Sequence, residues 1–116
     1  MGDISGITLV GTTGTVTTLA AMAQNLLIYD PARIHNFTLD LAKIRKMEKE
    51  LIGRTQSERM AVLGLEPGRA DVIVAGTLIL RCTMESLRFD RCLVSDYGLR
   101  EGIVVDLAKR VDRKTA

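Results

Sequence analysis

Two short strand-like segments, far apart in the chain, constrain the fold most. Residues 7–10 and residues 91–94 are rich in residues that favour strands, and each is followed by a loop and a helical pattern. The long stretch between them has mainly helical periodicity. These features predict two parallel strands joined by a right-handed helical crossover, with about five helices in all.

Two parallel strands do not form a sheet that is stable alone. Parallel sheets are normally buried on both faces and contain more than a pair of strands. We therefore expect a helix-rich α/β domain from which strands are missing. Either the chain is part of a longer protein, or another chain completes the sheet.

The first two helices are defined by apolar spacing and by their ends. A helix is expected from Val16, with apolar residues at helical spacing to Leu27, and Pro31 lies beyond its end. Thr38 is the expected N-cap of a second, amphipathic helix that ends at Gly53. Residues 55–58 fit a capping box that opens a short helix.

The third long helix is expected over residues 71–87 and a last one over residues 99–109. The third is apolar around most of its first three turns, so we expect it to be central and buried. Gly76 within it suggests the close approach of another backbone. Residues 1–110 then form one folded unit, and residues 111–116 form a frayed, charged tail.

Composition argues against several classes of protein. The net charge of +2 arises from 16 basic and 14 acidic residues, which gives no indication of nucleic-acid or membrane binding. The longest apolar stretch, residues 72–80, is far shorter than the roughly 20 residues that span a bilayer. No secretory signal is visible, and Cys82 and Cys92 are expected to be reduced thiols in a cytoplasmic protein.

Residues 11–15 form the main candidate binding loop. The loop lies between a predicted strand and a helix N-terminus, where free N–H groups and the helix dipole favour anions. Gly11 and Gly14 let the backbone approach a phosphate, and Thr12, Thr13 and Thr15 add hydroxyl donors. The spacing matches neither a Walker loop nor the G-x-G-x-x-G fingerprint. A tight turn with threonine N-caps is the alternative interpretation.

A second loop, residues 95–98, follows the second predicted strand. Parallel strands place both loops at their carboxyl ends, where ligands bind in open α/β sheets. The first 32 residues contain no Lys or Arg, so Arg69 and Arg100 are candidates to supply positive charge there. Ser95 and Gly98 complete this possible cleft.

Other polar residues near these loops have less specific roles. Asp96 and Glu101 are candidate metal or water contacts, with capping and surface ion pairs as the alternative. The single histidine, His35, is expected in a surface loop. Cys92 is expected in the core, and no catalytic triad or Cys–His pair can be drawn.

Several motifs together resemble the exopolyphosphatase and guanosine pentaphosphate phosphohydrolase family. They are GTTGTVTTLA at residues 11–20, YDP at 29–31, GLEPGRADVI at 64–73, AG at 75–76 with IL at 79–80, and SDYGLREG at 95–102. The resemblance covers nearly the whole chain. It implies a partial RNase H-like fold of the actin and sugar-kinase superfamily, with this chain as the C-terminal half of the second domain.

The resemblance also implies a reaction and a role for the first loop. In the family, phosphate loops from two domains hold polyphosphate or guanosine pentaphosphate, a divalent cation such as Mg²⁺ assists, and an acidic residue of the first domain activates water. The loop at residues 11–15 matches one phosphate loop residue by residue. The acidic residue has no counterpart here, so the chain alone is expected to hold no metal and to be inactive.

The sequence departs from the family pattern at one position, and it leaves two alternative functions open. Thr13 stands where the family commonly has glycine, and a threonine held at positive φ is strained. A fragment of a superfamily sugar or acid kinase is one alternative. The other is a non-catalytic interaction module that associates through an exposed strand edge, giving a homo-oligomer, most simply a symmetric dimer.

Overall fold

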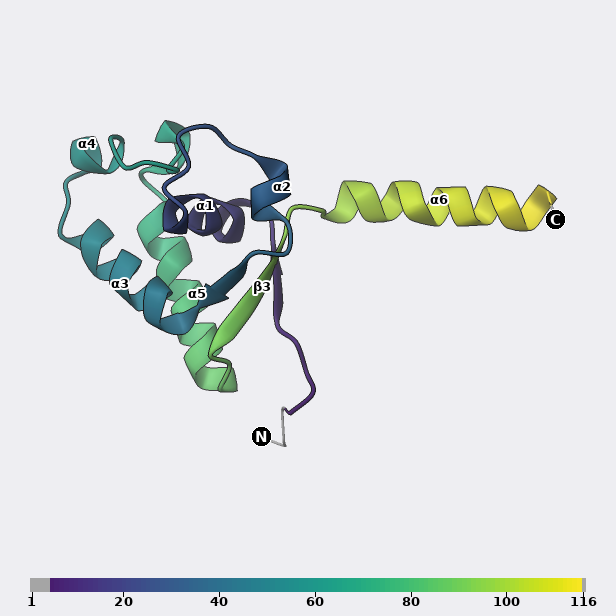
Figure 1. The fold of residues 1–116 in the computed structure, drawn as a ribbon, viewed down its shortest axis with the longest axis horizontal. Helices are drawn as coiled ribbons and strands as arrows, with labels where there is room; N and C mark the ends of the chain where they lie inside the picture. The colour runs from purple at the N-terminus through teal and green to yellow at the C-terminus, as the bar shows by residue number, and fades with distance from the viewer. Residues whose placement is uncertain (1–4, 116) are drawn as a thin grey trace.

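A small mixed sheet forms the centre of the domain. The computed structural model describes residues 5–115 (Figure 1). Strands β1 (Val10–Thr12), β3 (Arg91–Ser95) and β2 (Thr38–Asp40) lie side by side in that order. β1 and β3 are parallel, as predicted, with Val10 opposite Leu93. The α/β class is thus confirmed.

The third strand, β2, corrects the prediction of a two-stranded sheet. It runs antiparallel to β3, with Thr38 opposite Leu93 and Asp40 opposite Arg91. Leu39 is fully buried between its exposed neighbours, so one side chain anchors the strand. Thr38 is therefore a strand residue and not a helix N-cap. The N-cap of the following helix is Asp40, which makes no side-chain capping bond.

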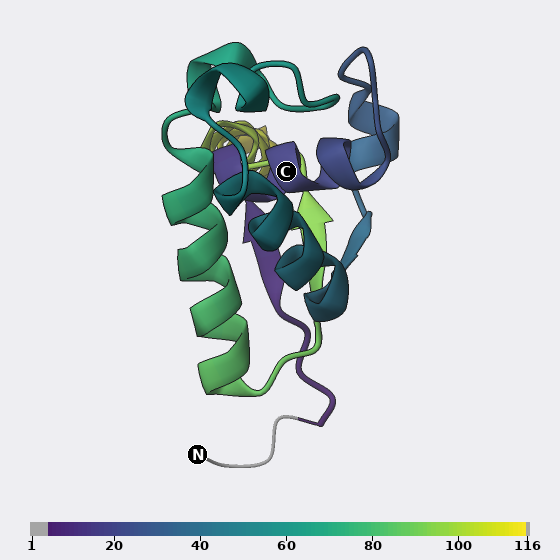
Figure 2. The same ribbon diagram turned by 90° about the vertical axis from the view of Figure 1, so that its left-hand side faces the viewer.

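Three helices cover one face of this sheet. They are α1 (Gly14–Ala23), α3 (Leu41–Ile52) and α5 (Ile73–Leu87). Figure 2 looks onto this layer, with α3 and α5 in front of the strands. Short turns of helix connect them: α2 (Pro31–Ile34), α4 (Gln56–Arg59), which opens with the predicted capping box, and the 3₁₀ turn Pro67–Arg69.

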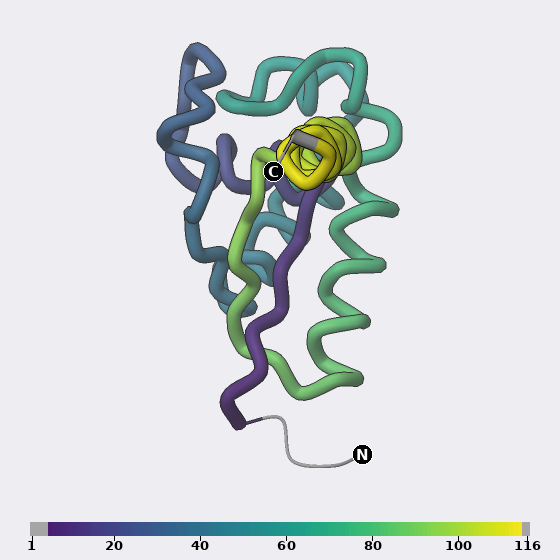
Figure 3. Tube along the Cα trace, turned by 90° about the vertical axis from the view of Figure 1, so that its right-hand side faces the viewer, coloured from purple at the N-terminus to yellow at the C-terminus, as the bar shows by residue number. Residues whose placement is uncertain are grey.

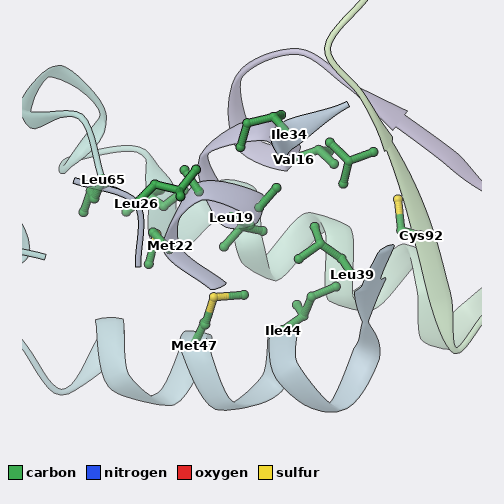
Figure 4. Close-up of a cluster of buried hydrophobic side chains, with 14 of the residues drawn as sticks. Val16, Leu19, Met22, Leu26, Ile34, Leu39, Ile44, Met47, Leu65 and Cys92 are labelled. Atoms are coloured by element: carbon green, nitrogen blue, oxygen red, sulfur yellow. The ribbon is translucent and has the colours of Figure 1, made fainter. Parts of the chain in front are cut away.

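The core lies between the sheet and the three helices. Figure 4 shows side chains from α1, α3 and the strands pointing into one cluster. Burial of each large aliphatic side chain stabilises the fold by about 1.5–3 kcal/mol before entropy is counted. The fully buried large side chains include Leu19, Ile34, Leu39, Ile44, Ile73 and Met84.

The first and third helices differ from the predictions in their extent and burial. α1 ends at Ala23, and Asn25 adopts a positive φ of 51°, so Leu27 is exposed rather than packed. α5 buries only the face that meets α1 and α3. Ile79 on its outer side is 67% exposed, because no described element covers that side.

The close approach expected at Gly76 is made by a side chain of α1 rather than by a backbone. A Cβ atom at Gly76 would lie 3.0 Å from Cγ2 of Thr15 and closer still to its hydroxyl oxygen. α5 and α3 are also joined by an ion pair between Glu48, which is buried, and Arg81. These contacts fix α5 relative to the start of α1 and relative to α3.

The last helix, α6 (Leu99–Thr115), projects away from the rest of the domain (Figure 1). The helix continues to Thr115, past the residue 109 at which it was expected to end, into the segment where a frayed tail was expected. An ion pair between Asp106 and Arg110 at 3.0 Å supports it, and Arg113 and Lys114 stand favourably at its C-terminal end. Its apolar side chains, among them Ile103 and Leu107, are exposed.

The opposite face of the sheet has no covering layer within residues 5–115. Figure 3 views this side, with β1 and β3 in front and α6 seen end-on. β1 is an edge strand with one unpaired edge, and Val10 is 54% exposed. A half-covered sheet with a parallel edge strand is consistent with the expectation that strands are missing. No helix in the described part is long and apolar enough to cross a membrane.

Candidate functional site

The candidate phosphate loop, residues 11–15, comprises the last two residues of β1, the N-cap Thr13 and the first two residues of α1, so the strand lies later in the chain than the predicted residues 7–10. Thr13 is the N-cap and has φ 67° and ψ −168°, a conformation that glycine adopts far more readily than threonine. Its side chain makes no capping hydrogen bond, and the first turn contains no acidic residue. The first N–H groups of a helix lack intrahelical acceptors, so here they are directed to an anion or to water.

The threonine hydroxyls of the loop are partly engaged within the protein. The Thr12 hydroxyl donates to the carbonyl oxygen of Tyr97 at 2.7 Å. Thr15 packs against Gly76, and Thr13 is exposed. The expectation that Thr12 offers its hydroxyl proton to a phosphate therefore needs correction. The backbone N–H groups remain the principal donors of the loop.

Arg69 brings positive charge to this otherwise uncharged loop. Its guanidinium group lies against Gly14, where a Cβ atom would come within 2.7 Å of the Arg69 Cζ atom. Arg69 also forms a weak ion pair with Glu66, at 3.7 Å. The structure thus places this predicted cleft residue beside the N-terminus of α1. Gly14 makes the approach possible because it has no side chain.

The second loop, residues 95–98, lies next to the first, as predicted. A Cβ atom at Gly98 would be 3.6 Å from both the Thr12 hydroxyl and the Thr13 methyl group. The Ser95 hydroxyl accepts from the Tyr97 N–H at 3.1 Å and lies 3.0 Å from the Tyr97 carbonyl oxygen, which closes the turn.

The two charged residues after this turn, Glu101 and Arg100, differ in their contacts. The Glu101 carboxylate accepts from the Gly98 N–H at 2.7 Å, which lowers its pKa. Glu101 thus caps the start of α6, as the alternative reading held. Arg100 is exposed in the first turn of α6, and no hydrogen bond or ion pair within residues 5–115 ties its side chain to the candidate phosphate loop.

Two residues that the sequence did not place at the site hold the second loop. The Tyr29 hydroxyl donates a short hydrogen bond to the Asp96 carboxylate. Burial, followed by this carboxylate, raises the pKa of Tyr29 to about 12. His35, expected in a surface loop, is half-buried, and its Nδ1 accepts from the Asp96 N–H at 3.2 Å. The position of Tyr29 in the YDP motif was the only available signal.

Within residues 5–115, no group of three or more His, Cys, Asp or Glu side chains is arranged to hold a metal ion. The two nearby carboxylates, Asp96 and Glu101, already accept hydrogen bonds from Tyr29 and Gly98. Cys92 is buried, as predicted, and burial raises its pKa.

The fold and loop together define an α/β domain of the actin-like ATPase class, with a candidate anion loop at the carboxyl edge of its sheet. The sequence profile of the Ppx/GppA phosphatase family matches residues 3–111. The chain belongs to this family, and it corresponds to the C-terminal part of the second domain.

Relatives and solved structures agree with this assignment. The chain is 38% identical to exopolyphosphatase 2 of Mycobacterium tuberculosis over 105 residues, which are 87% of this chain and 33% of that protein. The Ppx/GppA family member of Aquifex aeolicus superimposes with a TM-score of 0.85 at 38% identity, over 89% of this chain and 34% of that one. An exopolyphosphatase from Cytophaga hutchinsonii superimposes with a TM-score of 0.73 at 27% identity, over 86% and 33% of the two chains. The chain thus spans about a third of the length of these proteins.

Proposed function

We propose that this chain supplies one phosphate-binding loop of a phosphoanhydride hydrolase that releases terminal phosphate from inorganic polyphosphate or guanosine pentaphosphate. The observation that carries the proposal is the uncapped N-terminus of α1 with the Arg69 guanidinium against Gly14. Oriented N–H groups and a guanidinium are a suitable set of donors for phosphate oxygens. Membership of a phosphatase family favours hydrolysis over the kinase alternative.

Each residue of the site then has its own role in phosphate binding. The N–H groups of Gly14 and Thr15 bind phosphate oxygens, while Gly11 lets the strand end close to the helix. Arg69 neutralises the charge of the same phosphate. Ser95 and Gly98 border the loop through the adjacent turn, and Arg100 offers a second cation at the start of α6.

The attack by water is assigned to residues outside this chain. In-line displacement of a phosphoryl group needs a carboxylate to activate water and a divalent cation to offset charge. Asp96 and Glu101 are already engaged by hydrogen-bond donors. We therefore propose that the remaining part of a longer protein supplies the acidic residue, and that a divalent cation such as Mg²⁺ would offset the charge of the phosphate.

The same remaining part is the proposed partner of the open face of the sheet. Val10, the free edge of β1 and the apolar side chains of α6 are exposed in this chain, which spans a third of its relatives. Without that partner, the free edge favours association of two copies of the chain. Both cysteines are free, in keeping with the cytoplasmic location that we propose.

Titration with tripolyphosphate tests the proposal. With the ¹⁵N-labelled chain, we expect the largest NMR shifts at the amides of Gly14 and Thr15. R69A should weaken binding by about 10- to 100-fold, the contribution of hydrogen bonds to a charged group. R91A is the matched control, because Arg91 is exposed at the opposite end of β3 and should leave the affinity unchanged.

Two results would contradict the proposal. One is the absence of any tripolyphosphate-dependent shift in the loop of the folded chain. The other is an equal loss of affinity in R69A and R91A, which would indicate unspecific attraction. A separate assay with Mg²⁺ and polyphosphate should detect no phosphate release, and release by the purified chain would refute the assignment of the acidic residue to another part of the protein.

A further inference from the structure

We propose that His35 is a positioning residue for the candidate phosphate loop, acting through the turn at residues 95–98. Its neutral imidazole accepts a hydrogen bond that holds this turn against Thr12. The inference rests on the proposed function for its consequence in phosphate binding. The contacts themselves are independent of that function.

The first step is that the backbone and the ring of His35 are both held in place. His35 is the C-cap of α2, and its N–H donates to the Pro31 carbonyl at 2.9 Å. The N–H of the next residue, Asn36, donates to Val94 in the central strand at 2.8 Å. The imidazole lies 4.3 Å from the Tyr97 ring, between centroids, at a tilt of 41°. The ring therefore has a defined place beside the end of β3.

The second step is the protonation state that the contact requires. The Asp96 N–H is the donor and His35 Nδ1 is the acceptor, at 3.2 Å. A neutral imidazole accepts at one nitrogen only, so the proton of His35 resides on Nε2. An imidazolium, or the tautomer with its proton on Nδ1, cannot make this bond. The contact is thus specific for an acceptor at the Nδ1 position.

The third step connects Asp96 to the loop. The next residue, Tyr97, presents its carbonyl oxygen to the Thr12 hydroxyl at 2.7 Å. The same oxygen lies 3.0 Å from the Ser95 hydroxyl, so the turn is stiffened from within. Movement of Asp96 therefore changes the position of the acceptor that orients Thr12. His35 reaches the phosphate loop by this route without touching it.

A second hydrogen bond to Asp96, made by Tyr29 of the same segment, supports this interpretation. Tyr29 holds the Asp96 carboxylate while His35 holds the Asp96 N–H. The segment that carries both residues is itself ordered, because the Asp30 carboxylate accepts from the Ala32 N–H at 3.1 Å and pairs with Arg33 at 3.7 Å. Residues that precede β2 therefore form hydrogen bonds with both the backbone and the side chain of Asp96.

The test compares H35N with H35Q in the purified chain. The Oδ1 atom of asparagine is bonded to Cγ, as Nδ1 is, whereas the Oε1 atom of glutamine lies one bond further out. We expect H35N to keep the tripolyphosphate affinity within about twofold and H35Q to weaken it about five- to tenfold, the effect of one hydrogen bond. The amide resonances of Thr12 and Asp96 should stay near their wild-type positions in H35N and move in H35Q.

Three outcomes separate this inference from the proposed function. If H35N and H35Q bind tripolyphosphate equally well and leave the Thr12 amide unmoved, the positioning role is refuted. If the wild-type chain binds no tripolyphosphate, the proposed function fails, and the amide shifts still decide the positioning role. Direct ¹⁵N measurement of the His35 ring provides a third check, because a protonated Nδ1 at neutral pH in the folded chain would overturn the inference.

Discussion

The guanidinium of Arg69 rests on the backbone of Gly14, at the point where α1 begins. The two residues come from distant segments, and their contact combines a positive charge with a helix N-terminus. A helix N-terminus alone attracts anions weakly, because its partial charge is about half a unit. We expect the added guanidinium to favour a group with several anionic oxygens, such as a terminal phosphate.

A methyl group at Gly14 should displace Arg69 with little effect on folding. In G14A the new Cβ would collide with the end of a flexible side chain, which can swing away. We expect tripolyphosphate binding to weaken about 10-fold or more, measured by calorimetry, while the melting temperature changes little. G102A is the control, because a Cβ at Gly102 meets nothing within 4 Å. Unchanged binding by G14A would show that Arg69 does not contribute.

Glycine at position 13 should stabilise the chain. Thr13 has φ 67° and ψ −168°, where a residue with a Cβ is strained by about 1–3 kcal/mol. T13G relieves this strain and adds flexibility to the unfolded chain, so we expect a net gain of about 1 kcal/mol in urea unfolding. T13A keeps the Cβ and should give no such gain. An equal gain from T13A and T13G would indicate that the backbone at Thr13 is unstrained.

The hydroxyl of Tyr29 should make stability depend on alkaline pH. Its pKa is raised from 10 to about 12 in the folded state, through burial and then through Asp96. Below pH 10 the contribution is fully present, and it is lost as the pH rises through 12, because the folded state retains the proton that the unfolded state has released. Y29F should be less stable than wild type at pH 9, and the difference should shrink by pH 11.

The matched control for this measurement is Y97F. The Tyr97 ring lies against His35, whereas the contacts of this residue with Thr12 and Ser95 are made by its backbone. Denaturant unfolding of the three proteins at pH 9 and pH 11 provides the comparison. The interpretation fails if Y29F and wild type lose stability in parallel over this range.

The sequence predicts those parts of the candidate site that depend on local residue patterns. A strand followed by Gly11 and Gly14 marks a strand-to-helix loop, and parallel strands bring two such loops to the same edge. This logic placed Gly98 beside Thr12 and indicated Arg69 as a source of charge. Arg69 was named, with Arg100, only as a cation that the uncharged loop lacks, because nothing in its own segment points to Gly14.

The features that sequence reasoning missed depend on contacts between distant segments. β2 is only three residues long and buries one side chain, Leu39. A segment this short cannot be recognised as a strand from the alternation of apolar and polar residues. It is a strand because β3 offers it a free edge. Tyr29 and His35 join Asp96 through single hydrogen bonds across more than half of the chain, and such contacts leave no periodicity. α6 is extended by the ion pair between Asp106 and Arg110 and by the basic residues near its C-terminal end. Sequence patterns do not locate a helix end to the residue, so this extension was not predicted.

Alanine at Gly76 should destabilise the chain through Thr15. The new Cβ would lie 3.0 Å from the Thr15 Cγ2 atom and closer to its hydroxyl, and a β-branched side chain has few alternative rotamers. α5 must then shift relative to α1, at a cost of about 1–3 kcal/mol despite the better helix propensity of alanine. T15A removes both colliding atoms, so the double variant G76A/T15A should recover most of the loss. Urea unfolding of the four proteins gives the coupling energy between the two positions, and a value near zero would mean that the packing of α5 on α1 does not depend on this contact.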